Sequence, residues 1–483
     1  MWGQKQSAMI TEVMLFQILL ATNNEGKVTK SNISESMFIL SDGVFEHYMP
    51  EEAIKEFRNN GKKYFNKEYT KKLFNDIDKH IKSFFKFSED IKKIDFTNLS
   101  NQKLKKILTD YFSYIKKTFI YFGTSTPEST YFLEKKVKEI IRKKVHNDEI
   151  FKDYFISLCT PEEMDVTMEE RIYFFNLMKK KKVSEKEIEV YSRKFPALFF
   201  NTYSKKEVID YLYEKLKEKK TEKEINLEIK NIKDNLIKVS KKHEEIYSII
   251  NDKKLKEYST ILQKSGIFRY RLKHCWSGAE YLCLDLLKEV QKRIGGEFND
   301  FIKTYTFKDI FYFLETGKSL NINKIKERKK SIILHHVNNN TNTYFGANGV
   351  KHKNEFIEKE DKKIKSKTIK GMPANRGIIT AKARIVNVKD LKQFSKDCKQ
   401  FQKGEIIVTT MTSPIMVQII QKSSGIITDE GGICSHAAVI SREFGIPCIV
   451  GTLGASFIIK TGDLIELDAN KGTIEIIKKK KDK

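Results

Sequence analysis

One histidine in this chain stands where a helix can favour its phosphorylation. His436 follows two glycines, Gly431 and Gly432, and comes directly after Ser435. Ser435 is a favoured N-cap residue and Gly445 a favoured terminator, so the pattern predicts a short helix that begins at His436. The N-terminus of a helix presents unbonded N–H groups and a partial positive charge, which favour an anion beside it. A neutral imidazole there is a nucleophile, and its phosphorylated form is a dianion that those groups can hold. The residues therefore predict a phosphohistidine carrier with His436 as the catalytic residue.

Three side chains near His436, and the two glycines before it, are candidates for supporting a phosphoryl group. Thr428 and Ser435 carry hydroxyls that can donate to phosphate oxygens, and a plain turn or capping role accounts for each equally well. Arg442 lies close to two helical turns after His436, and it either reaches the phosphoryl group or forms a surface ion pair. The glycines allow the backbone to approach the group closely.

The sequence around His436 resembles the mobile, or swivelling, phosphohistidine domain of phosphoenolpyruvate synthases, pyruvate phosphate dikinases and rifampicin phosphotransferases. Residues 371–386 are similar to the family's opening Gly-x-Pro-Ala motif and first strand. Residues 405–414 resemble its next strand and Thr-x-Pro turn, and residues 462–472 resemble its closing hairpin. The resemblance implies an α/β swivelling domain over residues 371–477, with His436 at the position of the phosphorylated histidine.

Several positions depart from the family pattern. Asn375 and Arg376 replace a serine and a small residue, Ala381-Lys382 replaces a common glycine, and Ile415 replaces an acidic residue. These changes bear on docking to a donor domain, and they give some weight to a non-catalytic scaffold that kept the fold. The histidine after Gly-Gly argues against a scaffold, because structural need alone does not demand it.

Residues 1–337 are predicted to form a large, mostly α-helical domain. Apolar residues recur at spacings of three and four, and a helix is expected over 277–294, with Ser277 and Glu280 as a capping box and Gly295 at its end. The chain is therefore an α+β multidomain protein, with a helical N-terminal domain followed by the α/β swivelling domain. Between them, the polar residues 338–370 are predicted to be a linker, and residues 478–483 form a basic tail.

The helical region also resembles, more loosely, the central domain of rifampicin-phosphotransferase-like and phosphoenolpyruvate-synthase-like proteins. In that family the helical domain binds the phosphate acceptor. The resemblance makes Arg269, Arg271 and Arg293 candidate acceptor-binding residues, with structural ion pairs as the alternative for each. His335 and His336 lack the spacing of metal ligands and are expected in a loop.

The cysteines and the apolar segments of the chain indicate the cellular compartment in which it is expected. The six cysteines lie far apart with no Cys-x-x-Cys pair, which argues against a zinc site or a disulfide framework and fits a reducing cytoplasm. No metal site is expected. The apolar run 9–21 is too short to span a bilayer and carries Glu12, so it is predicted to be a buried helix. The protein is therefore expected in the cytoplasm, with no membrane partner.

The net charge of +26 raises the possibility of a nucleic-acid partner. Only 11 of the 90 basic residues are arginine, and no nucleic-acid-binding motif appears. A surface solvated by lysine is the better interpretation, and no nucleic-acid partner is expected.

A carrier histidine needs a donor and an acceptor. The chain has no glycine-rich phosphate loop, no room for an N-terminal ATP-grasp domain, and no phosphoenolpyruvate-binding barrel after residue 477. We expect a separate ATP-grasp protein that binds Mg-ATP and phosphorylates His436, no cofactor bound to this chain directly, and a small-molecule acceptor on the helical domain. The enzyme would be incomplete without that partner. The alternatives are a component of a split phosphoenolpyruvate synthase or pyruvate dikinase, and a non-catalytic scaffold.

Overall fold

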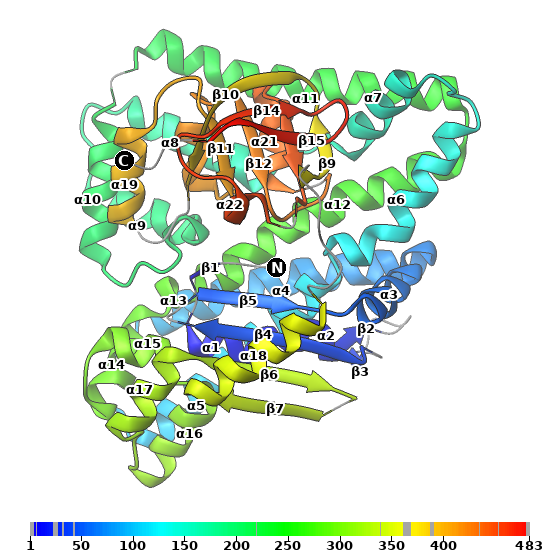
Figure 1. Cartoon of the computed structure of the whole chain (residues 1–483). Coiled ribbons are helices and arrows are strands. Elements are labelled where there is room, and N and C mark those ends of the chain that lie inside the picture. The colour runs from blue at the N-terminus through cyan, green and yellow to red at the C-terminus, as the bar shows by residue number, and fades with distance from the viewer. Residues whose placement is uncertain are drawn as a thin grey trace. The chain divides into compact units, whose positions relative to one another are not determined.

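The computed structural model divides the chain into two compact units (Figure 1). The first is built from Tyr131–Tyr270 and Ser366–Lys483, and the second from Trp2–Thr130 and Arg271–Lys365. The structure describes residues 4–5, 7–22, 28–30, 33–41, 44–218, 220–338, 340–360, 369–386, 391–433, 435–452 and 454–479. Two helices, α6 (Pro127–Arg142) and α12 (Lys253–Trp276), include the points at which the chain passes from one unit to the other.

The second unit contains an antiparallel sheet that the sequence analysis did not predict. Its strands lie in the order β1-β5-β4-β6-β7 (Figure 1). The inner strands β4 (Glu35–Ser41) and β6 (Ile332–Val337) come from opposite ends of the unit's sequence and pair antiparallel. The other strands are β1 (Gln4–Lys5), β5 (Val44–Tyr48) and β7 (Asn340–Phe345), and β2 (Leu20–Thr22) pairs with β3 (Val28–Lys30) in a separate hairpin.

Helices make up the rest of the second unit. They are α1 (Ala8–Met14), α2 (Phe16–Leu19), α3 (Glu51–Asn60), the 3-10 helix η1 (Gly61–Phe65), α4 (Lys67–Ile91), α5 (Asn101–Gly123), α13 (Ala279–Leu282), α14 (Leu284–Ile294), α15 (Phe298–Thr304), α16 (Phe307–Thr316), α17 (Ile322–Lys330) and α18 (Gly346–Glu360). The prediction of a large, mostly helical N-terminal region is confirmed. The buried helix expected over residues 9–21 is present as α1 and α2 up to Leu19, and most of the side chains of these helices are buried. The prediction was wrong for residues 20–21, which lie in strand β2.

Three further local predictions for this unit were wrong. His335 and His336 lie in β6 and not in a loop, because a strand paired over long range leaves little local pattern in the sequence. The helix expected over 277–294 is two helices, and the Ser277 hydroxyl donates to the Lys273 carbonyl instead of forming a capping box. Gly295, with φ of 86°, ends α14 as expected.

The predicted linker also contains regular structure. Strand β7 and helix α18 occupy residues 340–360, so the interpretation of 338–370 as a bare linker is wrong for that part. Residues 361–368 lie outside the described residues, as do residues 480–483 of the predicted basic tail. The polar composition of β7 misled the prediction, because its side chains are largely exposed while its backbone pairs with β6.

The N-terminal half of the first unit is helical. Its helices are α7 (Asp148–Cys159), α8 (Val166–Met178), α9 (Glu185–Lys194), the 3-10 helix η2 (Pro196–Phe199), α10 (Lys205–Leu216) and α11 (Glu222–Ile250). Side-chain caps begin several of them: Asp165 accepts from the Thr167 and Met168 amides at α8, and Thr221 and Glu224 form a capping box at α11.

The C-terminal half of the first unit is built on an eight-stranded mixed sheet. The order is β8-β15-β14-β10-β11-β12-β13-β9, and the four strands from β10 to β13 pair parallel (Figure 1). The strands are β8 (Ile369–Lys370), β9 (Met372–Asn375), β10 (Ile378–Ile385), β11 (Ile406–Thr409), β12 (Gly425–Thr428), β13 (Cys448–Val450), β14 (Leu464–Asp468) and β15 (Thr473–Lys478). The helices between them are α19 (Leu391–Gln400), η4 (Pro414–Met416), α20 (Val417–Ile420), α21 (His436–Phe444) and α22 (Ala455–Ile458). The predicted sheet-containing C-terminal domain is thus confirmed.

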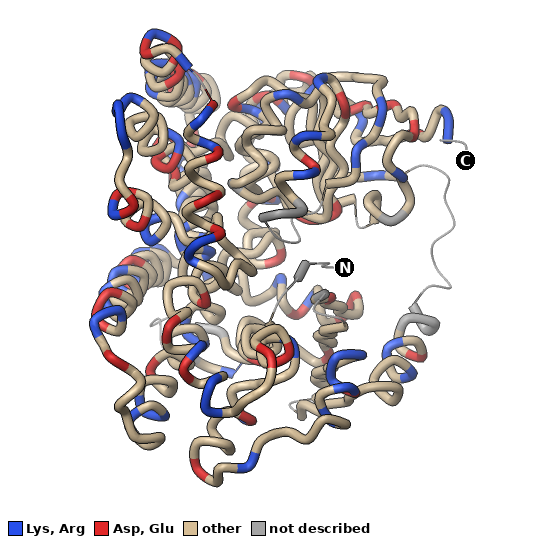
Figure 2. Tube along the Cα trace, turned by 90° about the vertical axis from the view of Figure 1, so that its left-hand side faces the viewer, with Lys and Arg blue, Asp and Glu red and all other residues tan. Residues whose placement is uncertain are grey.

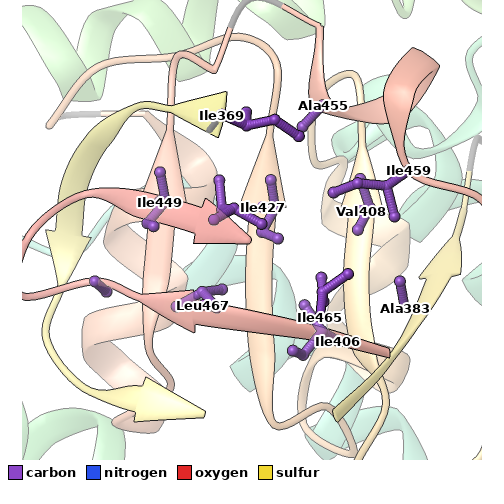
Figure 3. Close-up of a cluster of buried hydrophobic side chains, with 12 residues drawn as sticks. Ile369, Ala383, Ile406, Val408, Ile427, Ile449, Ala455, Ile459, Ile465 and Leu467 are labelled. Atoms are coloured by element: carbon purple, nitrogen blue, oxygen red, sulfur yellow. The ribbon is translucent and has the colours of Figure 1, made fainter. Parts of the chain in front are cut away.

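Aliphatic side chains from the strands of this sheet form its core. Val408, Ile427 and Ile449 come from adjacent parallel strands, and Ala455 at the start of α22 packs against the same cluster (Figure 3). β-branched residues suit such a doubly covered sheet, because their side chains fill the pleated surface with little loss of rotamer freedom. The core holds the ends of β11 and β12 in fixed positions.

Charged residues of both signs are spread along the helices (Figure 2). None of the helices in the described ranges is long and apolar enough to cross a membrane.

Two glycines of the C-terminal sheet allow a matched prediction. Gly445 (φ of 67°) and Gly472 (φ of 77°) both need a left-handed backbone, but only at Gly472 would a Cβ atom meet another atom, the Gly371 carbonyl oxygen at 2.5 Å. We expect Gly445→Ala to cost about 1 kcal/mol through backbone strain, and Gly472→Ala to cost roughly 1–3 kcal/mol more through overpacking. Hydrogen exchange of β14 and β15 peptides measures both opening free energies, and equal costs would contradict the clash.

Buried imidazoles give the second unit a defined pH dependence. Burial lowers the pKa of His47, His80 and His274 to about 3 in each case. In the unfolded chain these groups take up protons as the pH falls through about 6.5, so they lower the free energy of unfolding below that pH. Burial raises the pKa of Glu12 to about 7. As the pH falls, this carboxyl takes up its proton in the folded state first, so it raises the free energy of unfolding and offsets the effect of one imidazole.

We therefore expect the unfolding free energy of this unit to fall between pH 6.5 and 5. Each buried imidazole contributes about 1.4 kcal/mol per pH unit to that fall. His80→Gln can keep the hydrogen bond to Thr118 but removes one titrating group, so the slope should decrease by that amount. Urea unfolding followed by the fluorescence of the buried Trp276 tests this, and an unchanged slope in the variant would contradict a neutral buried His80.

Candidate functional site

The site is built at the carboxyl ends of two parallel strands. Strands β11 and β12 pair from Ile406 with Gly425 to Thr409 with Thr428, so both chains leave the sheet at the same edge. Two further backbone bonds continue the pairing, from the Asp429 amide to the Thr409 carbonyl (3.1 Å) and from the Glu430 amide to the Thr410 carbonyl (3.0 Å). The two loops that follow are therefore held side by side, and they carry the residues around His436.

His436 is the first residue of α21, as the sequence predicted. Ser435 is the N-cap, and its hydroxyl accepts a hydrogen bond from the Ala438 amide at 3.4 Å. Gly445, with φ of 67°, ends the helix. The nine residues of α21 therefore direct the positive end of the helix dipole and the first-turn N–H groups towards the His436 end.

The His436 imidazole is buried and neutral. It is 7% exposed, and burial lowers its pKa from 6.5 to about 3. Its Nδ1 atom lies 2.7 Å from the Thr412 hydroxyl oxygen, whereas Nε2 is buried without a hydrogen-bond partner in the described part of the chain. A neutral ring with one nitrogen held and the other unbonded can act as a nucleophile once a reacting atom reaches Nε2.

An aromatic ring covers the imidazole. Tyr270 of α12 lies with its ring centroid 5.6 Å from that of His436, at an interplanar angle of 52°. Tyr270 is 7% exposed, as is His436, so each ring removes the other from solvent. This contact explains the burial that keeps the imidazole neutral.

A buried carboxylate fixes the loop before the histidine. Asp429 is 1% exposed, and its side chain accepts from the Ser456 amide (2.9 Å), the Thr452 hydroxyl (3.2 Å) and the Ser456 hydroxyl. Gly431 follows with φ of 109°, and a Cβ atom there would lie 2.7 Å from the Ser435 hydroxyl oxygen. The loop therefore turns back on the N-cap of α21 only because this residue is glycine.

The structure gives the predicted supporting residues different roles. The Thr428 hydroxyl donates to the Glu430 carbonyl at 2.5 Å, and Ser435 caps α21, so in this state both hydroxyls serve the local fold. Arg442 donates to the Ile433 carbonyl (3.0 Å) and the Ala374 carbonyl (3.3 Å), which ties the loop before His436 to strand β9. Gly432 accepts from the Ser435 amide through its carbonyl at 2.9 Å.

The three candidate acceptor-binding arginines lie on two helices, Arg269 and Arg271 on α12 and Arg293 on α14. Arg269 and Arg271 flank Tyr270 along α12 and are half-buried, and Arg269 belongs to the first unit while Arg271 belongs to the second. The guanidinium of Arg293 pairs with Glu289 at 2.8 Å and donates to Asn101 and to the Phe96 carbonyl, each at 2.9 Å. Arg293 thus has a structural role in the second unit.

Sequence reasoning missed three residues of the site. Thr412 belongs to the Thr-x-Pro turn that the resemblance identified, so a signal for it existed. Asp429 directly follows Thr428 and had the pattern of an acidic residue at a strand end. Tyr270 had no local signal, because it meets His436 only through the packing of α12. No group of three or more His, Cys, Asp or Glu side chains within the described ranges is placed to hold a metal ion.

Comparison with known proteins identifies the C-terminal region. Residues 401–472 match the family described as PEP-utilising enzyme, mobile domain. A probable phosphoenolpyruvate synthase of Methanothermobacter thermautotrophicus is 40% identical over 120 residues, 25% of this chain and 17% of that protein. One from Staphylothermus marinus is 42% identical over 106 residues, 22% of this chain and 12% of that protein. The uncharacterized phosphotransferase YvkC of Bacillus subtilis is 40% identical over 118 residues, 24% of this chain and 14% of that protein.

The matched region spans at most 17% of the length of these three relatives. It contains His436, its N-cap, and the Thr412 and Asp429 loops, which are the parts of the site built from the C-terminal sheet. Residues 401–472 are therefore similar to the mobile domain of PEP-utilising enzymes.

Proposed function

We propose that this chain is a phosphotransferase component that carries a phosphoryl group on His436. The observation that supports this most directly is the neutral imidazole at the first position of α21, with Nδ1 at hydrogen-bonding distance from Thr412 and Nε2 unbonded in the described structure. The match of residues 401–472 to the mobile domain of PEP-utilising enzymes agrees with it.

In the proposed step Nε2 is the nucleophile. Its lone pair requires the proton to sit on Nδ1, where it is donated to the Thr412 hydroxyl oxygen. The N–P bond forms as the P–O bond of the donor breaks, and the departing oxygen keeps the electron pair. The low pKa of His436 means that no proton has to be removed from Nε2 first at neutral pH.

The N-terminus of α21 would then hold the phosphoryl group. Three oxygens with a charge near −2 are favoured beside first-turn N–H groups. The Ser435 hydroxyl is close to this position, because it already bonds the Ala438 amide one turn into the helix. Gly431 and Gly432 keep side chains out of the approach to these groups.

The donor and the acceptor are part of the proposal. We infer that a separate ATP-grasp protein supplies the phosphoryl group from Mg-ATP, and that a small molecule bound by the helical region accepts it. Relatives named phosphoenolpyruvate synthase favour a second candidate, in which this chain is one component of a split enzyme of that kind. Labelling by phosphoenolpyruvate distinguishes the two.

His436→Ala should abolish phosphorylation of the chain. Wild-type protein incubated with host extract and ATP, labelled at the β or the γ phosphorus in parallel, should gain acid-labile and alkali-stable phosphate. The variant should gain none, because the nucleophile is absent. His146→Ala, which removes an exposed histidine, is the matched control and should be labelled like the wild type.

Label in the His436→Ala variant would rule out this residue as the carrier. Absence of label from both proteins, in an extract whose donor phosphorylates another carrier, would favour a scaffold. Label from phosphoenolpyruvate but not from ATP would favour the split synthase.

Thr412→Val should slow the phosphorylation of His436 without unfolding the domain. Valine keeps the volume but leaves Nδ1 without its partner, so the imidazole loses its orientation and the preference for a lone pair on Nε2. We expect a rate loss of roughly tenfold, the value of one hydrogen bond, measured as initial rate of label uptake. Thr412→Ser retains the hydroxyl and should recover most of the rate; equal rates in both variants would contradict the role of the hydroxyl.

A further inference from the structure

Helix α21 is held at both ends by the helices of residues 131–270. At its first residue, the His436 ring meets Tyr270 of α12. At its last two residues, Arg171 of α8 bonds the Glu443 carboxylate, and its guanidinium carbon lies 4.9 Å from the centre of the Phe444 ring. The helix that carries the reactive histidine is therefore also a docking element.

The contact between Arg171 and Glu443 is a buried ion pair. Their side chains are 6% and 8% exposed. Arg171 also lies 3.5 Å from Glu228 of α11, whose side chain is 30% exposed. Burial raises the pKa of Glu443, and the positive charge of Arg171 offsets part of that rise. Arg171 therefore stabilises the charged form of the Glu443 carboxylate only while the two residues remain together.

Weaker polar contacts also join residues 131–270 to the C-terminal half of the first unit. Lys152 of α7 donates to the Asn470 carbonyl at 3.0 Å, and Arg376 donates to the Glu149 carbonyl at 2.7 Å. These are exposed bonds to backbone oxygens and are worth little in water. Among these polar contacts, the buried pair is therefore the one whose loss should change the docking equilibrium most.

A buried ion pair suits a contact that must come apart. Two separated charges regain their hydration, whereas a purely apolar interface would leave exposed hydrophobic surface on both sides. The pair also fixes one register, because a charge placed elsewhere in the interface would be unpaired.

We propose that Arg171 is the latch of a docked state, in which the mobile domain is held on residues 131–270 with His436 covered by Tyr270. Releasing Glu443 from Arg171 frees the C-terminal end of α21 and, with it, uncovers the imidazole. The latch deepens the proposed function, since a carrier histidine must leave this cover to meet a donor. Chemical labelling of side chains can detect this release, and the result does not depend on phosphorylation of His436.

The test measures the accessibility of His436 in the full-length chain. Diethyl pyrocarbonate acylates neutral imidazoles, and peptide mapping by mass spectrometry gives a rate for each histidine. In the wild type, the buried His436 should react far more slowly than the exposed His146. Glu443→Gln removes the charge of the latch and leaves Arg171 beside Glu228, so we expect the His436 rate to rise about five- to thirtyfold, the effect of one or two kcal/mol.

A second reporter distinguishes release of the domain from loosening of α21 alone. Cys398 of α19 is half-buried, and burial raises its pKa to about 12. It lies close enough to Tyr211 of α10 to contribute to the raised pKa of that phenol, after the larger effect of burial. Its Sγ atom accepts a hydrogen bond from Gln418 Nε2 at 3.4 Å. Alkylation of Cys398 by N-ethylmaleimide should therefore accelerate together with acylation of His436 when the domain leaves the helices.

Two further variants complete the design. Glu475→Gln, at an exposed position on β15, should change neither rate. Arg171→Lys keeps the charge but not the fork that reaches two carboxylates, so it should raise both rates by a smaller factor than Glu443→Gln. Unchanged protection of the buried His243 of α11 and of the buried Cys448 of β13 verifies that both parts of the first unit remain folded in each variant. A parallel rise of both reporters supports the latch; no change in His436, or a rise in His436 without Cys398, would overturn it.

Discussion

Parallel pairing of β11 with β12 is the constraint on which the site depends. The register that sets Thr409 opposite Thr428 places the next residues of both chains at one edge of the sheet, where two more backbone bonds keep them together. Thr412 is then within 2.7 Å of His436 although 24 residues separate them in sequence. Antiparallel pairing would place the two exits at opposite edges. The aliphatic core beneath these strands is therefore what determines the orientation of the imidazole, because it holds the two strands in register.

Burial and reactivity are linked in this site. An imidazole in water is about one quarter protonated at neutral pH, whereas the covered His436 is kept fully neutral by its surroundings. In the proposed carrier, the same cover would keep a phosphoryl donor away from Nε2. A phosphoryl dianion on His436 would be stabilised by the N–H groups of α21 and by solvent or cationic partners. An aromatic ring that excludes water would destabilise it. The proposed carrier chemistry therefore calls for two environments around one residue, and a domain that moves would supply both.

The sequence was informative where the determinants are local. The Gly-Gly pair, Ser435 and Gly445 predict the start and end of α21 within one helical turn. The family resemblance over residues 371–386, 405–414 and 462–472 predicts strands of the C-terminal sheet. It was uninformative where partners lie far apart. Strand β6 pairs with β4 across almost 300 residues, and nothing in the local pattern of either strand reveals its partner. Tyr270 could not be found for the same reason, because its role arises only when α12 packs beside α21.

Arg442 and Arg171 are both arginines, but they have different functions because they lie on different helices. Arg442 lies on α21 itself and bonds the carbonyl of Ile433, so both partners belong to the same part of the chain as His436. Arg171 lies on α8 and bonds α21 from outside, so in the proposed latch its contact would exist only in the docked state. Glu443, next to Arg442 in sequence, faces the helices because successive residues on a helix point about 100° apart. One turn of α21 thus holds both the residue that preserves the site and the residue that determines whether the site is covered.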